Sequence, residues 1–228
     1  VCGIFLTLGT NLQQFGIADT TAGKAGFITA LYIVMTPLLA FLILRRRVTM
    51  NVIVSVAIAV VGFYLLCITD GFGSITLADV VLLSTAVLFA GHILVIDTFG
   101  QKMDPILLSF GQISTTALLS WIGSLCEGSI DWAGAMQSWF PIVYAGIGSA
   151  GVAYTLQVVG QQLVPPSRAA VIMSLESFFS AVGGALLLGE VMTTRAYIGC
   201  ALIFIGTVLA QVPVKIPRLL RKLSLIHI

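Results

Sequence analysis

The chain has 228 residues, of which 58% are hydrophobic and only 9% are charged, and its formal net charge at pH 7 is +2. Together with a mean hydropathy of +1.09, these values exclude a water-soluble globular fold, which would need many more charged residues on its surface. The small net charge does not indicate a nucleic-acid partner.

The charged residues lie in short clusters that separate apolar runs of about 20 residues, enough for a helix to cross roughly 30 Å of hydrocarbon. The strict alternation of apolar and polar residues that is typical of membrane β-strands is absent, so the spans are expected to be helices. We predict eight spans, near residues 1–17, 25–44, 50–69, 78–98, 105–126, 139–161, 168–188 and 194–212. Their connections are short, so neighbouring helices should run antiparallel in an all-α, polytopic bundle.

Lys and Arg, counted over alternate connections, predict the orientation, because positive residues stay on the cytoplasmic side. One side holds only Lys24 and Arg195. The other side holds nine basic residues: Arg45, Arg46, Arg47, Lys102, Arg168, Lys215, Arg218, Arg221 and Lys222. We therefore expect a multi-pass protein of a bacterial inner membrane, with both ends of the chain in the cytoplasm. Three tryptophans are then placed near the outer interface: Trp121, Trp132 and Trp139.

The four cysteines lack the spacing of metal ligands and are expected to be buried, unpaired thiols: Cys2, Cys67, Cys126 and Cys200. No phosphate-binding loop or metal-ligand cluster is present in the sequence either. We predict neither a metal nor another cofactor.

A shift of the chain against itself by 144 residues indicates an internal repeat. It aligns the following pairs: Gln13 with Gln157, Gly16 with Gly160, Thr49 with Thr193, Gly62 with Gly206, and Lys24 with Arg168. The helix that starts near Ala25 and its match near Arg168 run in opposite directions through the predicted membrane, so the repeats are inverted.

The repeat predicts how the chain is organised. Residues 1–69 would be the last three helices of a first repeat, residues 78–212 a second repeat of five helices, and residues 213–228 a basic cytoplasmic tail. Completing the symmetry requires two more spans before Val1, which gives ten spans in two inverted five-helix repeats.

Three strings carry a resemblance to a known family: "TTAGKAGFITALYIVMTPLLAF" (20–41), "SAGVAYTLQVVGQQLVPPSRAAVIMSLESFF" (149–179) and "LLLGE" (186–190). The chain resembles the EamA-type permeases of the drug/metabolite transporter superfamily over essentially its whole length. The resemblance implies a permease or exporter of small metabolites or drugs. It leaves open the substrate, the direction of transport, the coupling ion and whether the protein forms a homodimer.

Polar residues inside the spans are the candidates for a substrate site, because buried polar groups are costly in lipid and usually face a cavity or a partner. Glu176 lies near the middle of 168–188, with Ser180 one turn later on the same face. The repeat places Tyr32 and Thr36 at the matching positions, so we expect two polar stripes to line a central cavity. The alternative is that Glu176 is protonated and only holds helices together.

Four further polar residues lie within predicted spans. His92 could line the cavity or donate to a neighbouring helix. Gln13, Gln157 and Gln112 could bind substrate or hold helices together by hydrogen bonds. The run "AGIGSAG" (145–151) has the small-residue spacing that favours close helix contact.

Two other functions deserve consideration. His92 and Asp97 form an H-x4-D pattern that also occurs in membrane acyltransferases, but five residues of helix turn the two side chains about 140° apart. No activated Ser or Cys accompanies the pair, so we predict that the chain is not an enzyme. An accessory membrane subunit is the remaining alternative. We expect secondary transport by alternating access, with a small-molecule substrate and the lipid bilayer as the partners.

Overall fold

The computed structural model describes residues 1–20, 22–46, 48–68, 76–128, 130–187 and 193–211. Helices account for all the regular structure in these ranges, and no strand occurs among them. The helices are α1 (Cys2–Ala18), α2 (Ala22–Ala30), α3 (Tyr32–Leu42), α4 (Met50–Cys67), α5 (Leu77–Gly100), α6 (Pro105–Glu127), α7 (Trp132–Gln137), α8 (Trp139–Val143), η1 (Tyr144–Ala153), α9 (Tyr154–Gln161), α10 (Pro166–Met173), α11 (Leu175–Leu187) and α12 (Thr194–Gln211).

Each of the eight predicted spans falls on one or more of these helices, but three spans are divided. The span predicted at 25–44 breaks at Leu31 between α2 and α3, and the span at 168–188 breaks at Ser174 between α10 and α11. The span at 139–161 contains α8, a ten-residue π-helix η1 and α9. The short helix α7 lies in a connection and was not predicted.

Four stretches of the described residues are long and apolar enough, by length and composition, to cross a membrane: Ala25–Leu42, Leu77–Gly100, Pro105–Glu127 and Trp139–Gln161. Two shorter apolar helices lie at Met50–Leu66 and Thr194–Ala210. An all-helical fold with several such stretches is that of an α-helical membrane protein.

Local sequence explains where the long helices begin and end. The Thr76 hydroxyl accepts from the backbone N–H of Asp79, and the Asp79 carboxylate accepts from the Thr76 N–H, so a capping box starts α5. The Asp104 carboxylate accepts from Ile106 and Leu107 at the start of α6. Gly128 ends α6 in the left-handed conformation, with φ of 75°.

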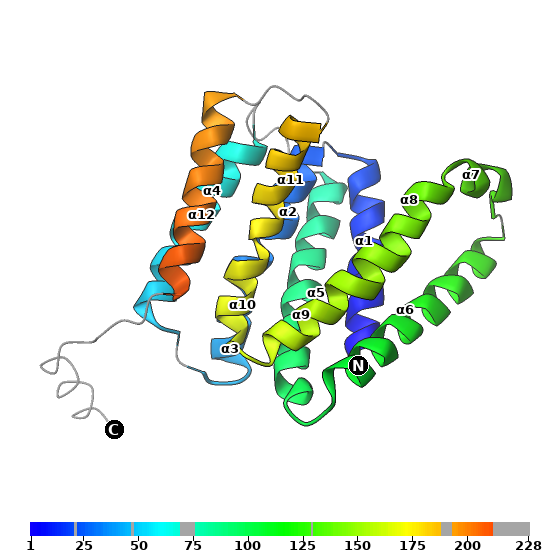
Figure 1. The fold of residues 1–228 in the computed structure, drawn as a ribbon, viewed down its shortest axis with the longest axis horizontal. Coiled ribbons are helices and arrows are strands. Elements are labelled where there is room, and N and C mark those ends of the chain that lie inside the picture. Colours follow the sequence, from blue (N-terminus) through cyan, green and yellow to red (C-terminus); the bar gives the residue numbers. More distant parts are fainter. Residues whose placement is uncertain (21, 47, 69–75, 129, 188–192, 212–228) are drawn as a thin grey trace, which may run out of the picture.

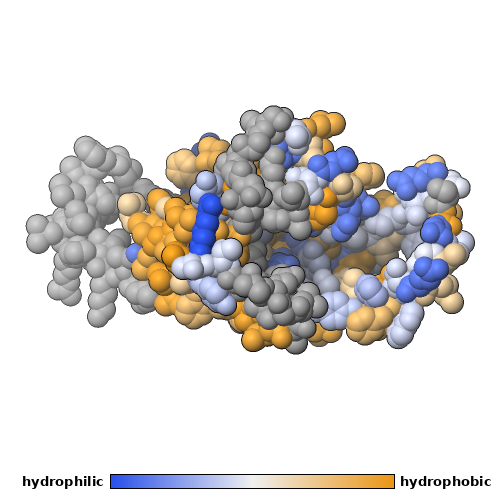
Figure 2. Space-filling view, turned by 90° about the horizontal axis from the view of Figure 1, so that it is seen from above, coloured by the Kyte–Doolittle hydropathy of each residue, from blue (hydrophilic) through white to orange (hydrophobic). Residues whose placement is uncertain are grey.

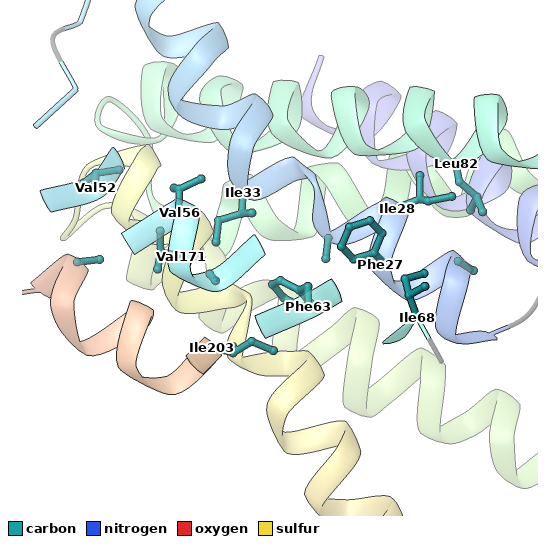
Figure 3. Close-up of a cluster of buried hydrophobic side chains, with 14 residues drawn as sticks. Phe27, Ile28, Ile33, Val52, Val56, Phe63, Ile68, Leu82, Val171 and Ile203 are labelled. Atoms are coloured by element: carbon teal, nitrogen blue, oxygen red, sulfur yellow. The ribbon is translucent and has the colours of Figure 1, made fainter. Parts of the chain in front are cut away.

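A hydrophobic core lies where α2, α3, α4, α10 and α12 meet (Figure 3). Ile33, Val171 and Ile203 are fully buried in it, and Phe63 is 1% exposed. In Figure 1, α4 and α12 lie at one end of the molecule, while α6, α7 and α8 lie at the other end. The core therefore anchors one half of the bundle, and the cavity described below lies beside it.

Helices α4 and α12 approach so closely that only glycine fits at their crossing. A Cβ atom added to Gly62 would lie 2.7 Å from the Gly199 carbonyl oxygen, and one added to Gly199 would lie 2.7 Å from the Gly62 carbonyl oxygen. About two turns further along α12, a Cβ atom on Gly206 would lie 2.9 Å from the Ser55 carbonyl oxygen. Backbone contact of this kind is a common way for membrane helices to associate.

Candidate functional site

A cavity of about 650 Å³ lies between α1, α2, α3, α5, η1, α9, α10 and α11. Figure 2 shows a hollow in the middle of the molecule with hydrophilic residues inside it, while hydrophobic residues cover much of the outer surface. This volume is in the range of about 300–1,000 Å³ that is usual for sites that bind small molecules.

Five of the eight residues proposed from sequence line this cavity: Gln13, Tyr32, His92, Gln157 and Glu176. They come from five different helices, α1, α3, α5, α9 and α11. The fold thus brings together side chains that lie up to 163 positions apart in the sequence.

Tyr32 and Glu176 each lie just after a helix break. Tyr32 is the first residue of α3, directly after Leu31, and Glu176 lies in the first turn of α11, two residues after Ser174. At the second break the Ser174 hydroxyl donates to the Val171 carbonyl at 2.6 Å, so a side chain satisfies this backbone oxygen. Leu31 and Ser174 both keep right-handed helical dihedral angles, with φ of −62° and −61°, so each break is a one-residue irregularity and the backbone is not unwound there.

Glu176 is exposed to the open cavity. Among the residues that the structure describes, none forms a hydrogen bond or an ion pair with its carboxylate. A carboxylate that lacks a partner beside a cavity can interact with a bound molecule or with water there.

His92 is 1% exposed, and its Nε2 lies 2.9 Å from Oε1 of Gln112 on α6. Its ring also packs edge-on against Tyr154, with centroids 6.4 Å apart and an interplanar angle of 71°. His92 is therefore held on two sides while it contributes to the cavity wall. Both roles proposed for it, cavity lining and bonding to a neighbouring helix, are consistent with this geometry.

Thr36 and Gln112 do not line the cavity. Thr36 lies one turn beyond Tyr32, where the helix packs against its neighbours. Its side chain is fully buried, and its hydroxyl donates to the Tyr32 carbonyl at 2.8 Å. Gln112 is 2% exposed behind His92 and lines a second, smaller cavity of about 340 Å³. The side chain of Ser180 lies outside the described residues.

Thr29 lines the cavity one turn before Tyr32. Residues three positions apart lie on the same face of a helix, so the two side chains are expected to line the same space. It is 7% exposed, and its buried hydroxyl oxygen has no hydrogen-bond partner in the described part of the chain. A buried hydroxyl without a partner costs free energy. Its position at the cavity makes a bound molecule or water a suitable partner.

Apart from Tyr32, sequence reasoning missed the Phe and Tyr side chains of the cavity, which are Phe89, Tyr144 and Tyr154. Aromatic residues are frequent in membrane helices, and their usual places are the packed interior and the interfaces. The signal that could have found Tyr154 is its position three residues before Gln157, on the same helical face.

The run at 145–151 does not make the close helix contact that its small residues predicted. Around Gly146 no atom lies within 4 Å of an added Cβ, and around Gly148 only the side chain of Tyr144 does. The run forms η1 instead, and Gly148 and Ser149 line the cavity. π-helical turns widen the backbone and are frequent at functional sites.

His92 and Asp97 do not converge, in agreement with the helical geometry. His92 binds Gln112, whereas Asp97 forms an ion pair with Arg46 at 2.5 Å. The prediction that all the cysteines are buried is wrong for Cys126, which is exposed near the end of α6. That end of the helix packs against little else in the described structure, so its side chains remain accessible.

Comparisons with known proteins agree on the class of protein. The profile of the EamA-like transporter family matches residues 76–211. An uncharacterized transporter of Archaeoglobus fulgidus is 29% identical over 215 residues, which cover 93% of this chain and 68% of the relative. A crystal structure of a protein with no stated activity has the same fold, with a TM-score of 0.77 and 19% identity over 98% of this chain and 77% of the other.

Proposed function

Because this chain belongs to the EamA-like transporter family, we propose that it is a secondary transporter, which moves small metabolites or drugs across the membrane by alternating access. The observation that carries this proposal is the composition of the cavity, whose lining includes pairs of residues 144 positions apart. These pairs are Gln13 with Gln157, Thr29 with Met173, and Tyr32 with Glu176. A cavity built from matched positions is what a site on the axis between two repeats requires.

The bounds of the helices support the repeat independently of the cavity. Helix α4 begins at Met50 and α12 at Thr194, which is a shift of 144 residues. The breaks at Leu31 and Ser174 are one residue off this register.

The contacts between α4 and α12 support the inversion. Gly62 meets Gly199, and Ser55 meets Gly206. Under the shift of 144 residues, Gly62 corresponds to Gly206 and Ser55 corresponds to Gly199. The first contact therefore corresponds to the second, with α4 and α12 exchanged. The later residue of α4 meets the earlier residue of α12, so the helices run antiparallel. Matched helices that run in opposite directions are the signature of an inverted repeat.

This arrangement supports alternating access as the mechanism. Two repeats of opposite direction can exchange their conformations, so that a site between them opens first to one side of the membrane and then to the other. Tyr32 and Glu176, at the helix breaks, would bind the substrate as the repeats rock. The activity of the family is transport rather than catalysis, and the sequence contains no ATP-binding motif, so the transport is secondary.

The orientation is part of the proposal. Arg45 and Arg46 follow α3, at the end of the bundle opposite α7 (Figure 1). Positive residues stay in the cytoplasm, which assigns that end to the cytoplasmic side. Trp121 and Trp132, with ring centroids 6.3 Å apart, would then lie at the outer interface.

Thiol labelling in membrane vesicles tests the proposal. The four native cysteines are replaced by serine, and single cysteines are introduced by Tyr32→Cys, by Gln157→Cys and, as a control on an outward apolar face, by Ile122→Cys. A membrane-impermeant thiol reagent is then added to right-side-out and to inside-out vesicles. We expect positions 32 and 157 to react from both sides and position 122 to react from neither.

The outcomes separate the parts of the proposal. Reaction of positions 32 and 157 from one side only would contradict alternating access but leave a water-filled cavity. No reaction from either side would overturn the cavity as a transport site and favour the accessory-subunit alternative.

A further inference from the structure

The charge of the cavity is unbalanced. Among the described residues that line it, Glu176 is the one Asp or Glu, and neither Lys nor Arg occurs. The described arginines that form close contacts do so elsewhere: Arg46 pairs with Asp97, and the Arg195 guanidinium lies 5.1 Å from the ring centroid of Tyr64. A carboxylate in a partly enclosed site gains most from a ligand that brings the missing positive charge.

Aromatic rings surround the same space. Tyr32, Phe89, Tyr144 and Tyr154 line the cavity with Glu176, and they come from α3, α5, η1 and α9. The faces of such rings attract cations, and groups of rings with a carboxylate are well suited to ammonium groups. Rings also bury the apolar body of a ligand. One acid among several rings is a poor site for an anion and a good one for an organic cation.

Polar groups at the cavity wall can complete the contacts. Gln13 and Gln157 supply amide oxygens and nitrogens, and the unpartnered Thr29 oxygen can accept a hydrogen bond from an N–H group of the ligand. The volume of about 650 Å³ leaves room for a molecule of drug or metabolite size.

We propose that the cavity selects small organic cations, with the positive group held between the Glu176 carboxylate and the faces of the neighbouring tyrosine rings. This inference rests on the proposed function, since it names the class of substrate for the same cavity. The ligand class follows from charge and ring chemistry together, because neither the carboxylate nor the rings alone would distinguish a cation from a polar neutral molecule.

Equilibrium binding to the full chain in detergent tests this inference with two probes of nearly the same shape and opposite charge, tetraphenylphosphonium and tetraphenylborate. We expect the wild type to bind the phosphonium. The Glu176→Gln variant should bind it at least tenfold more weakly, and Glu176→Asp, which keeps the charge, should bind more tightly than Glu176→Gln. Glu127→Gln is the matched control, because Glu127 is exposed at the end of α6 away from the cavity.

The aromatic contribution has its own pair of variants. Tyr32→Leu should weaken phosphonium binding several-fold, whereas Tyr197→Leu, at an exposed position that does not line the cavity, should leave it unchanged. Thermal unfolding of every variant in the same detergent checks that a loss of binding is not a loss of folded protein.

Three results would overturn the inference: equal phosphonium binding by the wild type and a folded Glu176→Gln, tighter binding of the borate than of the phosphonium, or no difference between Tyr32→Leu and Tyr197→Leu. These results do not depend on transport. If positions 32 and 157 label from both sides of the membrane while the phosphonium fails to bind, the substrate class is wrong and the proposed function stands. If the phosphonium binds but positions 32 and 157 do not label from both sides, the cavity binds organic cations and the proposed alternating access is wrong.

Discussion

The imidazole Nε2 of His92 lies 2.9 Å from Oε1 of Gln112, and the two residues line different cavities. His92 faces the larger cavity and Gln112 the smaller one, so their hydrogen bond forms part of the wall between the two. With the amide in this orientation the imidazole N–H donates and the glutamine oxygen accepts. Because both side chains are almost fully buried, the bond should contribute to stability.

Replacing Gln112 by leucine should destabilise the protein by roughly 1–2 kcal/mol, because the donor on His92 is left buried without its partner. Thermal unfolding in detergent measures the change. Gln14→Leu is the control, since Gln14 is exposed on α1 and lines neither cavity. Equal unfolding temperatures for the two variants would contradict a structural role for the His92–Gln112 bond.

Gly62→Ala should lower stability by roughly 1–3 kcal/mol, as expected for overpacking a close contact. The added methyl group would lie 2.7 Å from the Gly199 carbonyl oxygen and 2.9 Å from the Ile203 nitrogen, and these backbone atoms can move only if α4 and α12 separate. Gly123→Ala is the matched control, because no atom lies within 4 Å of that position on α6. Unfolding in detergent should therefore respond to the first change and not to the second.

The ion pair between Arg46 and Asp97 joins the segment after α3 to α5. Asp97 is 7% exposed and Arg46 is 48% exposed at their side chains, so Arg46→Ala leaves a buried carboxylate without its partner. We expect a loss of about 1–3 kcal/mol in unfolding free energy. Lys102→Ala, at an exposed position in the next connection, should have little effect.

A double-mutant cycle isolates the energy of this pair from the other effects of each change. If Arg46→Ala and Asp97→Ala together cost as much as the sum of the two single changes, the ion pair contributes nothing. A combined cost well below that sum is the expected result.

The positions of the helices were predictable, because an apolar run and its polar ends are local properties of the sequence. The interruptions at Leu31 and Ser174 were not, since neither residue is a strong helix breaker, and Pro37, the nearest proline to the first break, lies six residues later within α3. Helix α7 was missed for a different reason: its start depends on the Asp131 carboxylate, which accepts from the Gly134 N–H at 2.9 Å.

The candidate site was predictable where the proposed repeat constrained it. Gln13, Tyr32, Gln157 and Glu176 stand at matched positions, and all four line the cavity. Thr36 was misplaced because helical periodicity assigns a face to a residue but does not say where that face stops lining a cavity and begins to pack. The aromatic wall has no distinctive pattern in a chain with so many apolar residues.

Thr29→Val should separate a role in binding from a role in stability. The Thr29 hydroxyl is buried and has no partner among the described residues, so replacing it by a methyl group of the same shape should leave the unfolding temperature unchanged or raise it. If a ligand uses this hydroxyl, the same change should weaken tetraphenylphosphonium binding or the protection that a ligand gives position 32 from labelling. Gain in stability with loss of binding is characteristic of a functional residue.

Thr36→Val is the matched control for this last change, because it is the same substitution seven residues further along the divided span. Its hydroxyl already donates to the Tyr32 carbonyl at 2.8 Å, so its loss should cost about 0.5–1.5 kcal/mol of stability. Since Thr36 does not line the cavity, binding measured on the folded variant should not change. If both variants lose stability and keep their affinity, Thr29 is a packing residue and the cavity uses other groups to hold its ligand.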